Sequence, residues 1–215
     1  MLGCELILLF WSLFSGVSIS LLTMISMKKF CKIQIPNQIV ITLLIISVIS
    51  SFFSIIHSSV PTIAFRMIIL LAFMCASAFI SVKNKKFPDI ILIYAIVLRV
   101  IIAVIDVVSF KEQFTEIVIH DMMGLILGSG VLFLINKICE KLSDKPIFSL
   151  YEIKVIALMG LFTGYVCTYS SLMLAFVFLL FMKLLARKKL GKNINLSLQP
   201  FILCGYLISM IMCVA

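Results

Sequence analysis

Long apolar stretches alternate with short polar connections along the whole chain. A helix that crosses the hydrocarbon core of a bilayer needs about 20 apolar residues at a rise of about 1.5 Å each. Stretches of this size predict eight helices, at approximately residues 5 to 26, 37 to 57, 61 to 82, 88 to 107, 117 to 136, 150 to 167, 169 to 186 and 198 to 215. We therefore predict an all-α fold, a polytopic transmembrane helical bundle of about eight spans, with residues 1–215 forming a single integral membrane domain.

The composition agrees with a lipid environment. Hydrophobic residues make up 63% of the 215 residues and charged residues only 13%. Typical soluble chains are about 45–50% apolar and about 25% charged. An ordinary soluble protein is excluded, because polar groups could not cover the surface of such a fold. The first apolar stretch has no positively charged start and is long enough to span, so we expect it to remain as a helix rather than act as a cleaved signal.

Basic residues are concentrated in every second connection. Thirteen of the eighteen lysines and arginines lie in four alternate loops, at residues 28 to 36, 83 to 87, 137 to 149 and 187 to 197. Short loops rich in Lys and Arg remain in the cytoplasm, so both termini are predicted to face outward. The net charge of +9 is therefore explained by the basic loops on one side of the membrane. Nucleic acid is not an expected partner, since the basic residues form no folded face with interleaved aromatics.

Five ionisable residues fall within predicted spans near the outer side of the membrane: Arg66, Arg99, Asp106, His120 and Asp121. Such groups are costly in lipid unless they face the bundle interior and are paired. Pairing between helices would neutralise the arginines and aspartates, whereas a transporter or channel subunit would use them as a path for a small solute. His120 could be a ligand or proton relay, but no second ligand accompanies it. The seven cysteines form no C-x-x-C pair, and we expect no metal site or cofactor.

Three separated pieces of the chain bring polar side chains to the cytoplasmic boundary. They are residues 81–89 (SVKNKKFPD), residues 149–154 (SLYEIK) and residues 198–201 (LQPF). Each piece lies within one or two turns of a predicted helix end. Polar groups from distant parts of a chain that meet at one membrane face indicate a site.

These pieces resemble motifs of the type IV prepilin peptidases, polytopic aspartic proteases of bacterial inner membranes that remove the leader peptides of prepilins and pseudopilins. In that family an aspartate ends one span, and a basic stretch and an Ile/Leu-Pro-Asp/Asn motif follow; here the chain reads SVKNKKFPDIILIYAIVLRV. The glycine-bearing span of the family is similar to DMMGLILGSGVLFL, its G-x-G-D-x-K motif to SLYEIKVIALMGLFTG, and its G-P-F segment to LQPFILCG. FSGVSISLLTM is similar to its opening helix. The resemblance covers most of the chain.

Where this chain departs from the motifs of the family, the departures fall on the family's two catalytic positions. Ser81 stands at the position of the first family aspartate and Glu152 at that of the second, while Lys154 matches the motif directly. An aspartic protease needs two carboxylates that share one proton, and a serine hydroxyl cannot replace one of them. Asp89 is the other carboxylate on this face, with helix N-capping as its alternative role. Glu152 could instead be a first-turn acid paired with Lys154 or Lys145.

Two related functions follow from the resemblance. The protein cleaves, or descends from an enzyme that cleaves, the leader of prepilin-like proteins, with Glu152, Asp89 and Ser81 as candidate catalytic residues and Lys154 as a binding residue. Alternatively, it is a family member without catalysis that binds or scaffolds pilin-like helices. Both place it in a bacterial inner membrane with prepilin or pseudopilin-like partners. The family's cysteine-rich insert is missing, which argues against an accompanying methyl transfer.

The predicted orientation is tested by labelling cysteines in intact cells. Cys31 and Cys139 lie in or beside basic loops that are predicted to be cytoplasmic. A membrane-impermeant thiol reagent should therefore leave both unmodified until the cells are permeabilised. Modification of either thiol in intact cells would show that the assigned sides are reversed.

Overall fold

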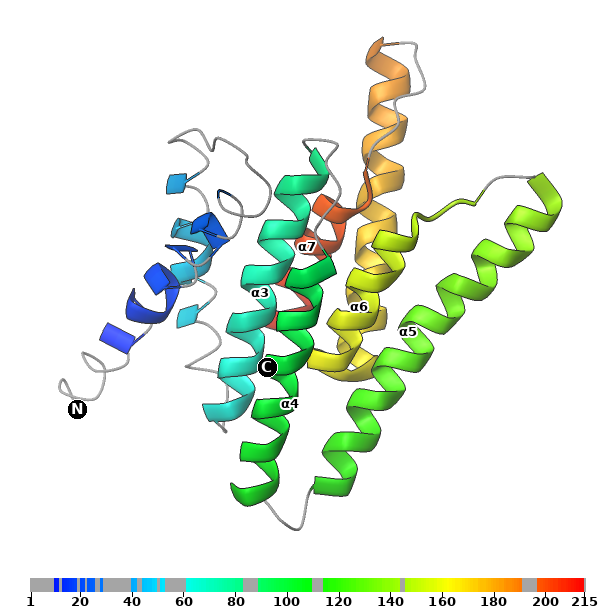
Figure 1. Cartoon of the computed structure of the whole chain (residues 1–215). Helices are drawn as coiled ribbons and strands as arrows, with labels where there is room; N and C mark the ends of the chain where they lie inside the picture. The colour runs from blue at the N-terminus through cyan, green and yellow to red at the C-terminus, as the bar shows by residue number, and fades with distance from the viewer. Residues whose placement is uncertain are drawn as a thin grey trace.

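The computed structural model shows a helical protein without strands among the residues that it describes (Figure 1). It describes residues 61–82, 89–109, 114–143, 146–190 and 197–214, together with parts of two helical stretches between residues 10 and 28 and between residues 40 and 52. The continuous helices are α3 (Pro61–Val82), α4 (Asp89–Ser109), α5 (Phe114–Ser143), α6 (Leu150–Leu190) and α7 (Gln199–Val214). The all-α prediction is confirmed for this part of the chain. Most of the loops predicted at residues 28 to 36, 83 to 87 and 187 to 197 lie outside the described residues.

Helix α6 folds back on itself at a single glycine. Gly164 has φ 73° and ψ −177°, a conformation outside the helical region that is essentially restricted to glycine. The two arms, residues 150–163 and 165–190, run side by side from this point in yellow and orange (Figure 1). Gly128 of α5 lies close to both Ile156 and Thr168, which would be about 18 Å apart along a straight helix. The helices predicted at 150 to 167 and 169 to 186 are thus one hairpin with its break at residue 164.

The predicted count of eight spans is not supported. Three described helices are long and apolar enough to cross a membrane, over Phe65–Val82, Val118–Leu142 and Leu150–Ala186. Helix α7 has 16 residues, which corresponds to about 24 Å against a hydrocarbon core of about 30 Å. Helix α4 has a suitable length but contains Arg99 and Asp106, as well as Asp89 at its first residue.

The core lies between α3, the first arm of α6, and α7. Fully buried side chains from these helices include Leu70, Leu71, Met74, Ile80, Ile156, Met159, Phe162, Ile202 and Tyr206. The Tyr206 hydroxyl is satisfied within this core, because it donates a hydrogen bond to the backbone oxygen of Met67 at 3.1 Å. In contrast, α4 buries a narrow stripe that includes Ile91, Ala95 and Ile102 and exposes apolar side chains around it, as expected for a surface in lipid.

Glycines allow the backbones of α5 and α6 to approach closely. A methyl group added at Gly124 would overlap the Gly160 carbonyl oxygen, and one added at Gly160 would overlap the backbone of Gly124. Small residues at helix contacts serve this purpose in membrane bundles. Gly128 also lies at this contact, next to Thr168, whereas Gly130 has no atom within 4 Å of an added methyl group.

We predict that Gly164→Ala destabilises the protein and that Gly130→Ala does not. The backbone conformation at residue 164 alone costs a non-glycine residue about 1–3 kcal/mol, and the new methyl group would also overlap the His120 ring. Unfolding of the purified protein, measured in detergent, gives the comparison. The double variant Gly164→Ala with His120→Ala should recover only the part of the lost stability that is due to the overlap with the His120 ring. Equal stability of Gly164→Ala and Gly130→Ala would show that the hairpin does not depend on this backbone conformation.

Candidate functional site

Glu152 forms a capping box at the start of α6. Its Oε2 accepts hydrogen bonds from the Ser149 backbone nitrogen at 2.8 Å and from the Ser149 hydroxyl at 2.9 Å, while the Glu152 nitrogen lies 3.2 Å from that hydroxyl. This reciprocal arrangement satisfies donors at a helix N-terminus. Its other oxygen, Oε1, accepts from the Leu198 nitrogen at 3.3 Å, next to the start of α7. Both carboxylate oxygens therefore accept hydrogen bonds from residues at the starts of helices, Oε2 at α6 and Oε1 at α7. The predicted pairing with Lys154 is wrong, and Lys145 lies outside the described residues.

Ser81 joins the same helix ends from the last turn of α3. Its hydroxyl is hydrogen-bonded to the hydroxyl of Ser197, the residue before Leu198. One turn earlier, Ser77 lies 3.4 Å from the Gln199 side chain. The start of α7 is therefore in contact with Ser81 on one side and with Glu152 on the other. Distant segments do meet here, as the sequence indicated, but through serine hydroxyls and a capping carboxylate.

Asp89 and Lys154 form an ion pair between α4 and α6. The Lys154 Nζ donates to Asp89 Oδ1 at 2.7 Å, and the two side chains are 52% and 70% exposed. Asp89 is the first residue of α4, where an acid also interacts favourably with the helix dipole. The structure therefore gives Asp89 a cationic partner and gives Glu152 backbone and hydroxyl donors. Neither carboxylate is hydrogen-bonded to the other.

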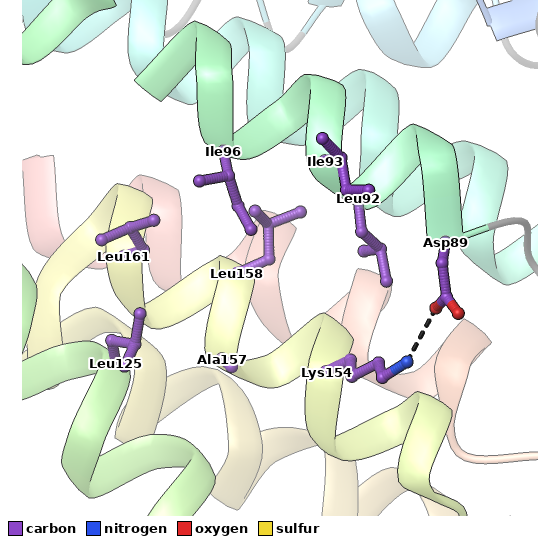
Figure 2. Close-up of a pocket in the computed structure, with 9 residues that line it drawn as sticks. All are labelled: Asp89, Leu92, Ile93, Ile96, Leu125, Lys154, Ala157, Leu158 and Leu161. Atoms are coloured by element: carbon purple, nitrogen blue, oxygen red, sulfur yellow. Dashed lines mark hydrogen bonds and ion pairs between the residues drawn. The ribbon is translucent and has the colours of Figure 1, made fainter. Parts of the chain in front are cut away.

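An apolar groove begins at this ion pair. It has a volume of about 460 Å³ and lies between α4, α5 and the first arm of α6 (Figure 2). Asp89 and Lys154 lie at one end of it, and the remaining lining side chains are Leu92, Ile93, Ile96, Leu125, Ala157, Leu158 and Leu161. This combination of an aliphatic wall and one polar end suits an apolar occupant that is oriented by its polar part. We refer to it below as the α4–α6 groove.

A second group of polar residues is buried deeper in the bundle. Arg66 of α3 donates to Asp106 of α4 at 2.7 Å, and Arg99 of α4 is paired with Asp121 of α5. The cross distances are 3.6 Å from Arg66 to Asp121 and 3.8 Å from Arg99 to Asp106. The four side chains are 1% to 9% exposed. We call them the buried charge cluster. Its two positive and two negative charges balance, which confirms the predicted pairing between helices.

Arg99 also links this cluster to the α6 hairpin. The last four carbonyl groups of a helix lack donors within that helix, and the break at Gly164 ends the first arm of α6. Arg99 Nε donates to the carbonyl oxygen of Leu161, in the last turn of this arm, at 3.1 Å. One guanidinium therefore neutralises Asp121 and caps the arm that carries Lys154. Sequence reasoning had missed this role, because the break at Gly164 is not visible as a change in polarity.

His120 packs at the turn of the hairpin. Its ring lies 5.0 Å, centroid to centroid, from the ring of Tyr165, and it fills the space beside Gly164. Within the described part of the chain, no group of three His, Cys, Asp or Glu side chains could hold a metal ion. The contacts of His120 are those of a packing residue.

No protein-family model, curated protein or solved structure matches this chain. Its function must therefore be argued from the α4–α6 groove and the polar groups around it.

We predict that loss of Arg99 is more damaging than loss of an exposed charge. Arg99→Leu leaves Arg66 as the one arginine beside two buried aspartates, and it should lower the free energy of unfolding by about 3–5 kcal/mol. Lys137 forms an exposed pair with Glu140 on α5, and Lys137→Met should cost at most about 1 kcal/mol. Arg99→Leu combined with Asp121→Leu should regain much of the loss. A double variant as unstable as the single one would mean that the Asp121 charge is not the cause.

Proposed function

We propose that this protein is a prepilin peptidase-like integral membrane protein that binds the apolar helix of a pilin-like partner without cleaving it. The α4–α6 groove is the observation that carries this proposal. Aliphatic side chains of three helices line it, and an ion pair closes one end. An apolar helix recognises such a groove by inserting side chains spaced three or four residues apart. A volume of about 460 Å³ suits side chains from one face of a partner helix.

The positions of the carboxylates favour binding over cleavage. Peptide hydrolysis by two acids requires that they share a proton, one carboxylate acting as base on a water and its protonated partner polarising the carbonyl. Glu152 is committed to Ser149 and Leu198, and Asp89 is paired with Lys154. Ser81 contributes only a hydroxyl. Cleavage of a leader peptide is the second candidate, which the order and spacing of the family-like motifs favour. It would require Asp89 and Glu152 to leave their present partners.

The proposed setting is a bacterial inner membrane. Three described helices have the length and apolar character of spans, which supports a membrane location. The basic loops are proposed to face the cytoplasm, because short Lys-rich and Arg-rich loops are retained there. The starts of α4 and of the first arm of α6 would then place the Asp89 end of the groove at the cytoplasmic boundary. Prepilin or pseudopilin-like proteins and the bilayer itself are the proposed partners.

We expect a pilin-like helix to cross-link to the groove and to keep its mass. A photoactivatable amino acid at Ile96 should capture the partner in nanodiscs, because this side chain lines the groove. The same group at Val104 is the matched control, since Val104 is exposed on the same helix and does not line the groove. Mass spectrometry of the unlinked partner reports cleavage.

Two outcomes would contradict this proposal. Equal capture from positions 96 and 104 would show that the groove is not the binding site. A shortened partner would establish peptidase activity instead, and in that case Asp89→Asn and Glu152→Gln should each abolish it if these two acids share the proton.

A further inference from the structure

Helix α4 and the first arm of α6 are connected by polar contacts at both ends of the α4–α6 groove. At one end Asp89 is paired with Lys154, and at the other Arg99 donates to the carbonyl oxygen of Leu161. The side chains between these points are apolar, including Ile93 and Ile96 of α4 and Leu158 of α6 (Figure 2). The width of the groove therefore depends on these two connections and on the packing between them.

The connection at Arg99 is buried and is held by two neighbouring helices. Arg99 is 3% exposed and bonds to α5 through Asp121 and to α6 through Leu161. Asp106, about two helical turns after Arg99 in α4, is 1% exposed and accepts a hydrogen bond from Arg66 of α3. Separating these groups would leave charges in a region without water to solvate them, which is costly. This end of α4 is therefore anchored to three helices.

The connection at Asp89 has the opposite character. The two side chains are 52% and 70% exposed, and each is accessible to competing ions or polar groups. Exposed ion pairs of this kind contribute little to stability. The neighbouring α4 side chains Ile90, Ile93 and Tyr94 are also exposed, at 44%, 57% and 55%. Ile91, Leu92 and Ala95 are the side chains of this half of α4 that are buried in the core.

We propose that the α4–α6 groove opens at its Asp89 end, by separation of Asp89 from Lys154 while α4 pivots on the buried charge cluster. Ile91 and Ala95 keep contact with the core during this movement, so that α4 tilts away from α6 rather than leaving the bundle. The Asp89–Lys154 pair then controls access to the groove. This inference rests on the proposed function only for the identity of the occupant, a partner's apolar helix.

Distances between spin labels test the movement without any partner. Labels coupled to a genetically encoded ketone amino acid at positions 90 and 150 report the Asp89 end, since both side chains are exposed and the native cysteines stay in place. Labels at positions 108 and 119, which are 71% and 59% exposed on α4 and α5, report the anchored end. The distances are measured by electron resonance in nanodiscs.

We expect Lys154→Met and Asp89→Asn each to increase the open population at the 90–150 pair by up to about five-fold, the change that loss of an exposed ion pair permits. The 108–119 distance should not change. The charge exchange Asp89→Lys with Lys154→Asp should restore the closed population, and Lys137→Met should leave it as in the parent protein. An unchanged 90–150 distance in both single variants, or an equal change at the 108–119 pair, would overturn the proposal.

Binding of a synthetic apolar pilin-like helix separates this inference from the proposed function. When only the open form is competent, apparent affinity rises in proportion to the open population, so both single variants should bind up to about five-fold more tightly. Opening without binding by any variant would refute the proposed occupant and leave the movement established. Weaker binding by Lys154→Met with tighter binding by Asp89→Asn would overturn the controlling role, because it would make Lys154 a direct contact of the helix.

Discussion

The pairing of two arginines with two aspartates inside the bundle is the interaction on which the rest of this structure depends. Arg66, Arg99, Asp106 and Asp121 bring three helices together, and the hydrogen bond from Arg99 to Leu161 adds a fourth. Buried charges of this kind are stable only as a set, since the two arginines neutralise the two aspartates. The cluster therefore determines where α4 lies, and the position of α4 in turn creates the groove beside α6.

The helices could be read from the sequence where local signals mark their ends. The predicted 61 to 82 matches α3 at both ends, and Asp89 after Pro88 begins α4 one residue from the predicted start. The fold within α6 could be located only approximately. The sequence predicted a break between residues 167 and 169, whereas the chain turns at Gly164, because glycine readily adopts the required positive φ. The N-terminal helices predicted at 5 to 26 and 37 to 57 are described only in part, and the residues described there are helical.

The location of the candidate site could be predicted from the sequence, but the contacts of its side chains could not. Motif spacing indicated that Ser81, Asp89 and Glu152 would approach one end of the bundle, and each contacts a neighbouring helix or helix end there. Their partners depend on the rotation of each helix about its axis, which apolar stretches do not specify. The capping role of Glu152 nevertheless has a signal in the sequence, because Ser149 precedes it by three residues in the Ser-x-x-Glu pattern of a capping box.

The division of the charge cluster among α3, α4 and α5 has a consequence for how the chain enters a membrane during synthesis. Arg99 of α4 is paired most closely with Asp121 of α5, and Arg66 of α3 is paired most closely with Asp106 of α4. A ribosome delivers these segments one after another, and α3 and α4 together carry two arginines and one aspartate of the cluster, so one arginine would meet lipid uncompensated until Asp121 of α5 arrives. The three helices must therefore be retained together at the insertion machinery until α5 has emerged. We therefore expect membrane insertion to be cooperative over at least residues 66–121.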